Sequence, residues 1–209
     1  MDTVILEGLS VSIDRRKVLK RLGYGSGSPP LSPPMEKILD EEIENASLKI
    51  DSRGMYLNLP LNSISGENVK MCDSAITFKS SYLSRHLMGC FRVTLFACTI
   101  GSGLEERIRW YFSKKEGTKG FILDGIGSVA VEGLAEKINL AITEKAEEEG
   151  YSTVSRFSPG YGDWGLSDQK IIFGLLRPEQ IGIGLNERYL MIPEKSITAV
   201  VGWKVKGEL

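Results

Sequence analysis

Apolar residues recur along this chain with two different periods, and the two periods predict helices and strands respectively. The clearest helical pattern covers about residues 120–149, where an apolar residue returns at every fourth position over five turns. This row consists of Ile122, Ile126, Ala130, Leu134, Ile138 and Ile142. The apolar run at 91–100 predicts a strong strand, and Gly101-Ser102-Gly103 then opens a helix that extends to about Lys115.

Weaker patterns predict the remaining elements. A short helix is expected at residues 12–21, with Ser12 as its N-cap, and a second helix from Ser32 or Pro33 to about Asn45. Weak alternation over residues 47–80 predicts two or three short strands. Ser167 is expected to cap a helix at 168–176 that Pro178 terminates, before strands at about 182–185, 188–192 and 197–203. Helices and strands alternate without a regular βαβ period, so the predicted class is α+β, a largely antiparallel twisted sheet packed with long helices.

A connector rich in Gly, Ser and Pro separates the first two predicted helices. It runs over residues 25–34, and its proline pairs cannot continue a helix. This pattern divides the chain into an N-terminal helical arm with a Pro/Gly linker, residues 1–45, and an α+β domain, residues 46–209. No internal repeat is visible in the sequence.

Charge and composition narrow the possible partners. With 26 basic and 27 acidic residues the formal net charge is −1, which argues against a nucleic-acid or anionic membrane surface as the partner. No basic-then-apolar leader opens the chain, and no apolar run reaches the about 20 residues that span a bilayer. Cys72, Cys90 and Cys98 lack Cys-x-x-Cys spacing, and the chain has one histidine. We therefore expect reduced thiols, no metal site and a cytoplasmic location.

The first half of the long predicted helix carries three polar residues in one row. Asp124, Ser128 and Glu132 are each four residues apart, on a segment whose other positions are apolar or glycine. A helix that is apolar on its other faces is buried, so this row is expected to be buried or to line a cleft. The alternative is that these side chains meet solvent at a gap in the packing, or cap a neighbouring helix.

A second candidate element is the turn from Arg156 to Gly162. Pro159 followed by Gly160 predicts a type II-like turn from Ser158 to Tyr161, with backbone N–H and C=O groups free to meet a ligand. The guanidinium of Arg156 suits a carboxylate or phosphate, and Tyr161 offers a face for stacking. The alternative is an ordinary surface turn with a solvated arginine.

Three further segments accompany the turn at Arg156–Gly162, namely Phe96–Glu105, Ile181–Glu187 and Met191–Ser196. Together the four fall within about residues 90–203, roughly half of the chain. Taken in order, they resemble the activation (reactivation) domain of cobalamin-dependent methionine synthase. The turn resembles that family's Arg-x-x-x-Gly-Tyr signature, and the other three segments resemble its strand with Thr-(Val/Ile)-Gly, its Gly-x-x-Leu-x-Glu-Ser element and its Met-x-Pro-x-x-Ser element.

The resemblance implies a binding site and a role. In that family the Arg-x-x-x-Gly-Tyr segment binds S-adenosylmethionine, which implies ligand contacts by Arg156, Ser158, Gly160 and Tyr161. A glutamate on the preceding helix contacts the methionine part of the ligand and is matched here by Glu132, with Asp124 in the same row. The implied role is the reductive methylation of cob(II)alamin, with cobalamin carried by a partner protein and an electron supplied by a flavodoxin-like donor.

The chain lacks the homocysteine-, folate- and cobalamin-binding parts of methionine synthase. We therefore expect it to act in trans, on a methionine synthase without its own activation domain or on a related corrinoid protein. One alternative is a non-enzymatic docking subunit that shields a corrinoid cofactor without binding S-adenosylmethionine. Another is a Rossmann-type methyltransferase whose glycine loop is the segment from Gly101 to Gly103.

Overall fold

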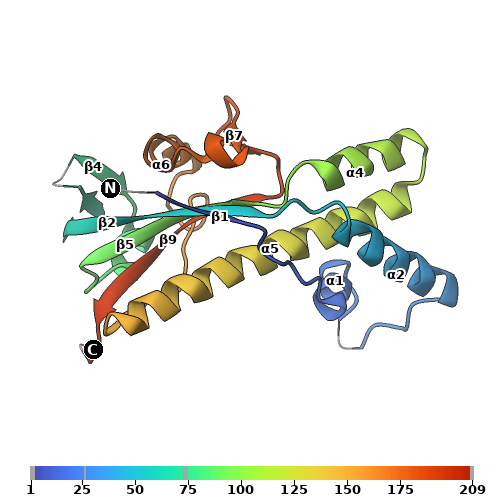
Figure 1. Cartoon of the computed structure of the whole chain (residues 1–209), viewed down its shortest axis with the longest axis horizontal. Helices are drawn as coiled ribbons and strands as arrows, with labels where there is room; N and C mark the ends of the chain where they lie inside the picture. Colours follow the sequence, from blue (N-terminus) through green and yellow to red (C-terminus); the bar gives the residue numbers. More distant parts are fainter. Residues whose placement is uncertain (1–2, 26, 73–74, 208–209) are drawn as a thin grey trace.

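The computed structural model describes residues 3–25, 27–72 and 75–207. Its centre is a curved antiparallel sheet, with one long helix, α5 (Gly117–Glu148), running along one face and a shorter helix, α6 (Gln169–Leu176), on the other (Figure 1). Beyond one end of the sheet, α5 continues and packs against three further helices, α1 (Arg15–Arg21), α2 (Pro33–Ser47) and α4 (Gly103–Ser113) (Figure 1).

The main sheet is antiparallel at every strand pair within the described residues. Its strand order is β4-β3-β2-β5-β9-β6, and β1 also pairs with β2, beyond the stretch of β2 that pairs with β3. These strands are β1 (Val4–Glu7), β2 (Arg53–Ser65), β3 (Asn68–Met71), β4 (Ile76–Lys79), β5 (Arg92–Thr99), β6 (Tyr151–Thr153) and β9 (Ser196–Val205). The predicted α+β class with a largely antiparallel sheet is confirmed.

The smaller elements cover the face of the sheet that α5 does not occupy. A short helix, α3 (Ser81–His86), follows β4. Two 3-10 helices, Leu166–Asp168 and Pro178–Ile181, flank α6, and a two-stranded hairpin of β7 (Gly184–Leu185) and β8 (Met191–Ile192) precedes β9.

Two hydrophobic clusters hold the layers together, one on each face of the sheet. Along β5 successive side chains point to opposite faces, as the pleat of a strand requires. Phe96 and Cys98 join the cluster beneath α5, whereas Leu95 and Ala97 join the cluster beneath α6. The six residues of the apolar row on α5 are all buried. Burying each large aliphatic side chain contributes about 1.5–3 kcal/mol, so this row fixes α5 on the sheet.

The predicted N-caps Ser12 and Ser167 were wrong, the strand expected at 188–192 is confined to Met191–Ile192, and one strand was missed. The first helix begins at Arg15, because Asp14 rather than Ser12 caps it and accepts hydrogen bonds from the Arg16 and Lys17 backbone N–H groups. Strand β1 was not predicted, since its four residues carry no alternation and are ordered by pairing with β2. Ser167 lies inside a 3-10 helix that precedes α6, so it is not the N-cap of that helix.

The glycine loop after β5 has a packing explanation. A Cβ on Gly103 would lie 2.7 Å from the backbone oxygen of Lys49, and one on Gly101, where φ is +76°, would lie 3.2 Å from the side chain of Asp51. Because these residues are glycines, the connector between α2 and β2 can pack against this loop. Its Asp51 N–H donates to the Ile100 carbonyl. The Rossmann-type methyltransferase interpretation is wrong, because the sheet is antiparallel and the backbone of this connector fills the space beside the glycine loop.

The first 45 residues contact the rest of the protein along α5 and β2. Val18 of α1 and Leu39 of α2 are buried in the same cluster as the apolar row of α5. The predicted domain boundary at residue 45 stays a prediction. In the structure, both N-terminal helices belong to the same hydrophobic core as α5. None of the described helices is both long enough and apolar enough to cross a lipid bilayer.

Candidate functional site

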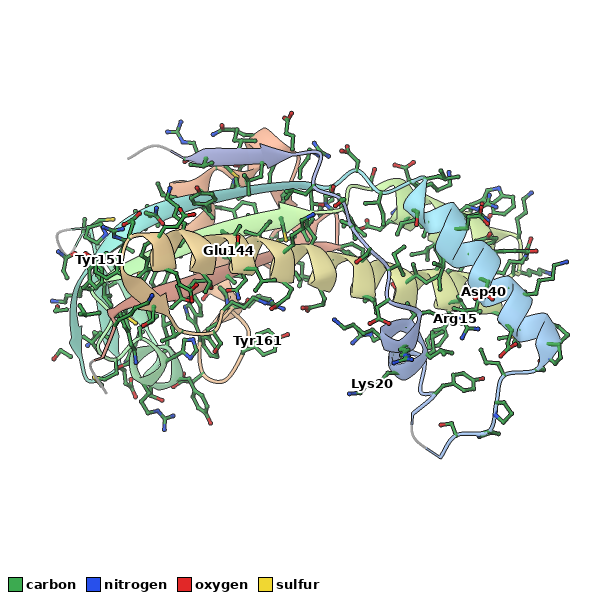
Figure 2. All side chains as sticks on the ribbon, turned by 60° about the horizontal axis from the view of Figure 1, so that its bottom comes forward. Arg15, Lys20, Asp40, Glu144, Tyr151 and Tyr161 are labelled. Carbon is green, nitrogen blue, oxygen red and sulfur yellow. The ribbon has the colours of Figure 1, made fainter. Side chains whose placement is uncertain are left out.

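A groove follows α5 on the side where the turn after β6 faces helix α1. It consists of two cavities that share Glu132, Glu136 and Arg156. The cavity next to the turn, here called the Tyr161 cavity, measures about 480 Å³, and the one next to α1, here called the α1 cavity, about 830 Å³. Figure 2 shows Tyr161 and Lys20 on the two opposite sides of this groove.

An ion pair between Arg156 and Glu132 lies where the two cavities meet. Nη2 of Arg156 donates to Oε2 of Glu132, and the two side chains are 24% and 54% exposed. Glu132 is held by α5, and Arg156 by a segment that continues pairing with β9 after β6 ends. In that segment the Val154 and Phe157 N–H groups donate to β9 carbonyls at 2.9 Å. The predicted acidic row and the predicted arginine turn therefore meet at one point.

The turn itself has the predicted type II geometry. The Tyr161 N–H donates to the Ser158 carbonyl at 3.3 Å, and Gly160 has φ +92°, which only glycine adopts readily. The expectation that these backbone groups are free for a ligand is wrong for the N–H groups of Gly160 and Tyr161 and for the carbonyls of Ser158 and Tyr161. The Gly160 N–H donates to the Trp164 carbonyl at 2.8 Å, and the Tyr161 N–H closes the turn. The ring of Tyr161 is available, because this residue is 64% exposed.

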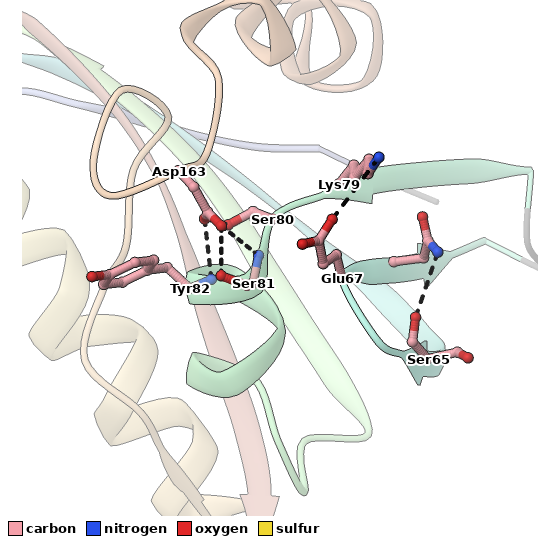
Figure 3. A network of polar contacts seen from close by, with 8 residues as sticks. Ser65, Glu67, Lys79, Ser80, Ser81, Tyr82 and Asp163 are labelled. Atoms are coloured by element: carbon pink, nitrogen blue, oxygen red, sulfur yellow. Dashed lines mark hydrogen bonds and ion pairs between the residues drawn. The ribbon is translucent and has the colours of Figure 1, made fainter.

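Asp163 ties this loop to helix α3, as Figure 3 shows. Its carboxylate accepts hydrogen bonds from the Ser80 hydroxyl, from the Ser81 hydroxyl at 2.6 Å and from the Ser81 and Tyr82 backbone N–H groups at 2.9 and 3.1 Å. The serine hydroxyls, with the backbone donors, hold the pKa of Asp163 well below its usual range. The turn that carries Tyr161 is therefore anchored at its far end by an ionised side chain.

The other two members of the acidic row bind a cation that the sequence analysis did not single out. Nζ of Lys195 donates to Asp124 at 2.7 Å and to the Ser128 hydroxyl at 3.0 Å. The Lys195 side chain is only 11% exposed, whereas that of Asp124 is 47% exposed. Of the six predicted contact residues, Glu132, Arg156, Ser158 and Tyr161 line the groove and Gly160 shapes its turn, but Asp124 is engaged by Lys195.

Further groove residues were missed, and the sequence contained a signal for some of them. Glu136 and Asn139 follow Glu132 at helical spacing on the same face of α5. Helix α1 carries five basic residues among seven, and three of them line the α1 cavity. Among the described residues, only Arg15 of these five forms an ion pair, with Asp40 at 2.8 Å (Figure 2). The three lining residues are Lys17, Lys20 and Arg21.

The thiols lie outside this groove. Burial raises the pKa of the Cys98 thiol to about 12 and that of Cys90 to about 11, so both stay protonated near neutral pH. Within the described part of the chain, no three His, Cys, Asp or Glu side chains are grouped so that they could hold a metal ion. The groove thus offers ion pairs, hydroxyls, an amide and aromatic faces for binding.

A comparison with solved structures finds the same architecture in another protein. The chain is similar to the MetH reactivation domain in a crystal structure of that domain bound to AdoHcy, with a TM-score of 0.71 and 14% sequence identity. The fold is that of the MetH reactivation domain. The match covers 100% of this chain, α1 and α2 included, and 80% of the MetH chain. No protein-family model and no curated protein matches the sequence.

Within this MetH reactivation domain fold, two of the four segments that carry the sequence resemblance border the groove. The turn from Arg156 to Tyr161 forms one wall, and the segment Met191–Ser196 contributes Glu194 and Lys195 to the α1 cavity. By contrast, residues of the segment Ile181–Glu187 line a separate cavity of about 760 Å³ between α6 and the β7–β8 hairpin.

Proposed function

We propose that this protein binds S-adenosylmethionine and its product AdoHcy in the groove along α5. The observation that carries the proposal is the Arg156–Glu132 ion pair at the junction of two ligand-sized cavities. Both cavity volumes fall within the roughly 300–1,000 Å³ that is usual for small-molecule sites. Support comes from the fold, because the MetH domain that it matches over the whole chain is bound to AdoHcy.

The charges of the groove complement an amino-acid ligand. A guanidinium has five N–H donors, and Glu132 accepts from one nitrogen of Arg156, so donors remain for the ligand's α-carboxylate. The carboxylates of Glu132 and Glu136 face the same space and suit the ammonium and sulfonium groups. A zwitterion can therefore enter the existing ion pair and leave each charge with an opposite partner.

We further propose that the bound S-adenosylmethionine serves the reactivation of a corrinoid protein. One electron from a flavodoxin-like donor reduces cob(II)alamin on the partner, and the methyl group then passes from the sulfonium to cobalt, which leaves AdoHcy. This chain's residues bind and orient the methyl donor, and none of them acts as a nucleophile. In the competing hypothesis, a docking subunit, the groove would contact the corrinoid protein without any adenosyl ligand.

Isothermal titration with S-adenosylmethionine and AdoHcy tests the binding site. Arg156→Ala is expected to weaken binding by about 1.5–3 kcal/mol, the range for a hydrogen bond to a charged group. Arg15→Ala is the matched control, because it removes another arginine–carboxylate pair, 41% and 60% exposed, that lies outside both cavities. Unchanged affinity in Arg156→Ala would remove Arg156 from the site, and no binding by the wild type would favour the docking subunit.

The reactivation role needs an assay of its own. A corrinoid protein held as cob(II)alamin, mixed with this protein, an electron donor and S-adenosylmethionine, is expected to regain the methylcobalamin absorbance spectrum. Free cobalamin at the same concentration should not respond, because the reaction depends on positioning two bound cofactors. A protein that binds S-adenosylmethionine but reactivates no cognate corrinoid protein would contradict the role and leave the binding site intact.

A further inference from the structure

The Tyr161 cavity contains one polar side chain that the recognition of a zwitterion does not use. Asn139 lies on α5 three residues after Glu136 and seven after Glu132, so it shares their face of the helix. Its Oδ1 atom is buried and has no hydrogen-bond partner among the described residues. A buried amide oxygen without a partner destabilises a protein, and most such groups in native structures are satisfied. Oδ1 itself has almost no exposed surface although Asn139 lines the cavity, so rotation of the side-chain amide is needed to turn Oδ1 toward the cavity, where a hydrogen-bond donor of a ligand would satisfy it.

The two cavities differ in what they offer to a nucleoside. The α1 cavity has no aromatic residue among its described lining residues, and three cations of α1 form one wall. The Tyr161 cavity presents Phe157 and Tyr161, together with the hydroxyls of Ser155 and Ser158. A purine gains stacking energy from an aromatic face and needs no charged partner. With the amino-acid end at the Arg156–Glu132 pair, the base is better accommodated on the Tyr161 side.

From these observations we infer that Asn139 recognises the adenine of the adenosyl ligand through the 6-amino group. The side-chain amide of asparagine matches adenine, because its oxygen accepts from the 6-amino group while its nitrogen donates to the adjacent ring nitrogen. Asn139 is then a specificity-determining residue, and the ligand spans the groove from Arg156 to Asn139. This inference rests on the proposed function, and it adds the base specificity and the orientation of the ligand.

A pair of ligands that differ at the 6-position of the purine tests it. On the N7 edge of S-inosylhomocysteine an oxygen replaces the 6-amino group of AdoHcy, so the donor that Oδ1 requires is absent there, and the proton that hypoxanthine carries on N1 lies on the other edge. The wild type is expected to bind AdoHcy on the order of tenfold more tightly, as for the loss of one or two neutral hydrogen bonds. In Asn139→Leu, which keeps a similar shape without the amide, affinity for AdoHcy should fall and the two affinities should become equal.

A thermal-unfolding measurement, a second variant at Asn139 and a control variant elsewhere separate base recognition from folding. Asn139→Leu removes an unsatisfied buried group, so its thermal unfolding temperature is expected to equal or exceed that of the wild type. Asn139→Ala gives a second variant with the same expected loss of preference, and Asn68→Ala changes an exposed amide outside both cavities. A preference for AdoHcy that persists in both Asn139 variants, or equal affinities in the wild type, would overturn the inference. Failure of the wild type to bind either ligand would instead overturn the proposed function on which it rests.

Discussion

The Asp124–Lys195 pair leads to a prediction about stability. Replacing an exposed residue usually costs less than replacing a buried one, and here we expect the opposite. Removing the more exposed partner should destabilise the protein more than removing the buried one. In Asp124→Ala the ammonium of Lys195, 11% exposed, keeps only the Ser128 hydroxyl as a partner. A buried charge that loses its counter-ion costs about 3–5 kcal/mol, and because the lysine retains one acceptor we expect about 3 kcal/mol.

The reverse variant should cost less. Lys195→Met keeps the aliphatic stem, which packs against Gly127, and leaves behind a carboxylate on Asp124 that is 47% exposed and hydrated. The loss should then be about 1 kcal/mol, as for an ion pair with a solvent-accessible partner. For a chain of this size 1 kcal/mol corresponds to about 2–4 °C, so Asp124→Ala should unfold roughly 4–8 °C below Lys195→Met.

Urea and thermal unfolding of the two single variants and the double variant measure this difference. The double variant Asp124→Ala/Lys195→Met should be more stable than Asp124→Ala alone, because it no longer holds an unpaired buried ammonium. Equal losses in the two single variants, or a larger loss for Lys195→Met, would refute the reasoning. If Asp124 acts by holding Lys195 and does not contact the ligand, the folded Asp124→Asn variant should bind AdoHcy with nearly wild-type affinity.

Two further predictions concern groups outside the ion pairs. The pKa of Asp163 is depressed in the folded protein, so its contribution to stability is complete above the ordinary carboxyl pKa near 4 and disappears as the pH falls further. The difference in unfolding temperature between the wild type and Asp163→Asn should therefore narrow between about pH 5 and pH 3. A constant difference would contradict the role of the Asp163 charge. Cys98→Ser should lower stability without changing the dissociation constant for AdoHcy, because the thiol is buried beneath α5 and lines neither cavity; a fully stable Cys98→Ser variant with weakened binding would contradict this.

The sequence was sufficient for features that depend on local periodicity and turn chemistry. The four-residue apolar step placed α5, and the Pro159-Gly160 pair predicted the type II turn, because both signals come from neighbours along the chain. Glu132 and Arg156 could each be proposed as a ligand contact, because Glu132 belongs to the polar row of an otherwise apolar helix segment, Arg156 opens the Pro-Gly turn, and the resemblance matches both to ligand-binding positions. Their contact still required the structure, since residues 24 apart in the sequence meet only after β6 pairs with β9.

What the sequence did not show depends on long-range packing. Strand β1 has no pattern of its own and is ordered by pairing with β2, about 50 residues away. Nothing in the sequence singled out Lys195 within the segment Met191–Ser196, and only the fold places its ammonium against Asp124, 71 residues earlier. Glu136 and Asn139 lie in the second half of α5, and they face the groove because the turn after β6 folds over that stretch.

The two walls of the groove differ in how firmly they are attached. The wall with Tyr161 is continuous with a strand of the sheet and is tied to α3 by Asp163. The wall formed by α1 is a seven-residue helix with one fully buried side chain, Val18, and an ion pair between two exposed groups. A segment with so little buried apolar surface opens at a lower free energy than the global unfolding of the protein. Amide exchange should therefore be faster in α1 than in α5, and we expect a ligand to enter and leave the groove on the α1 side, without disturbance of the sheet.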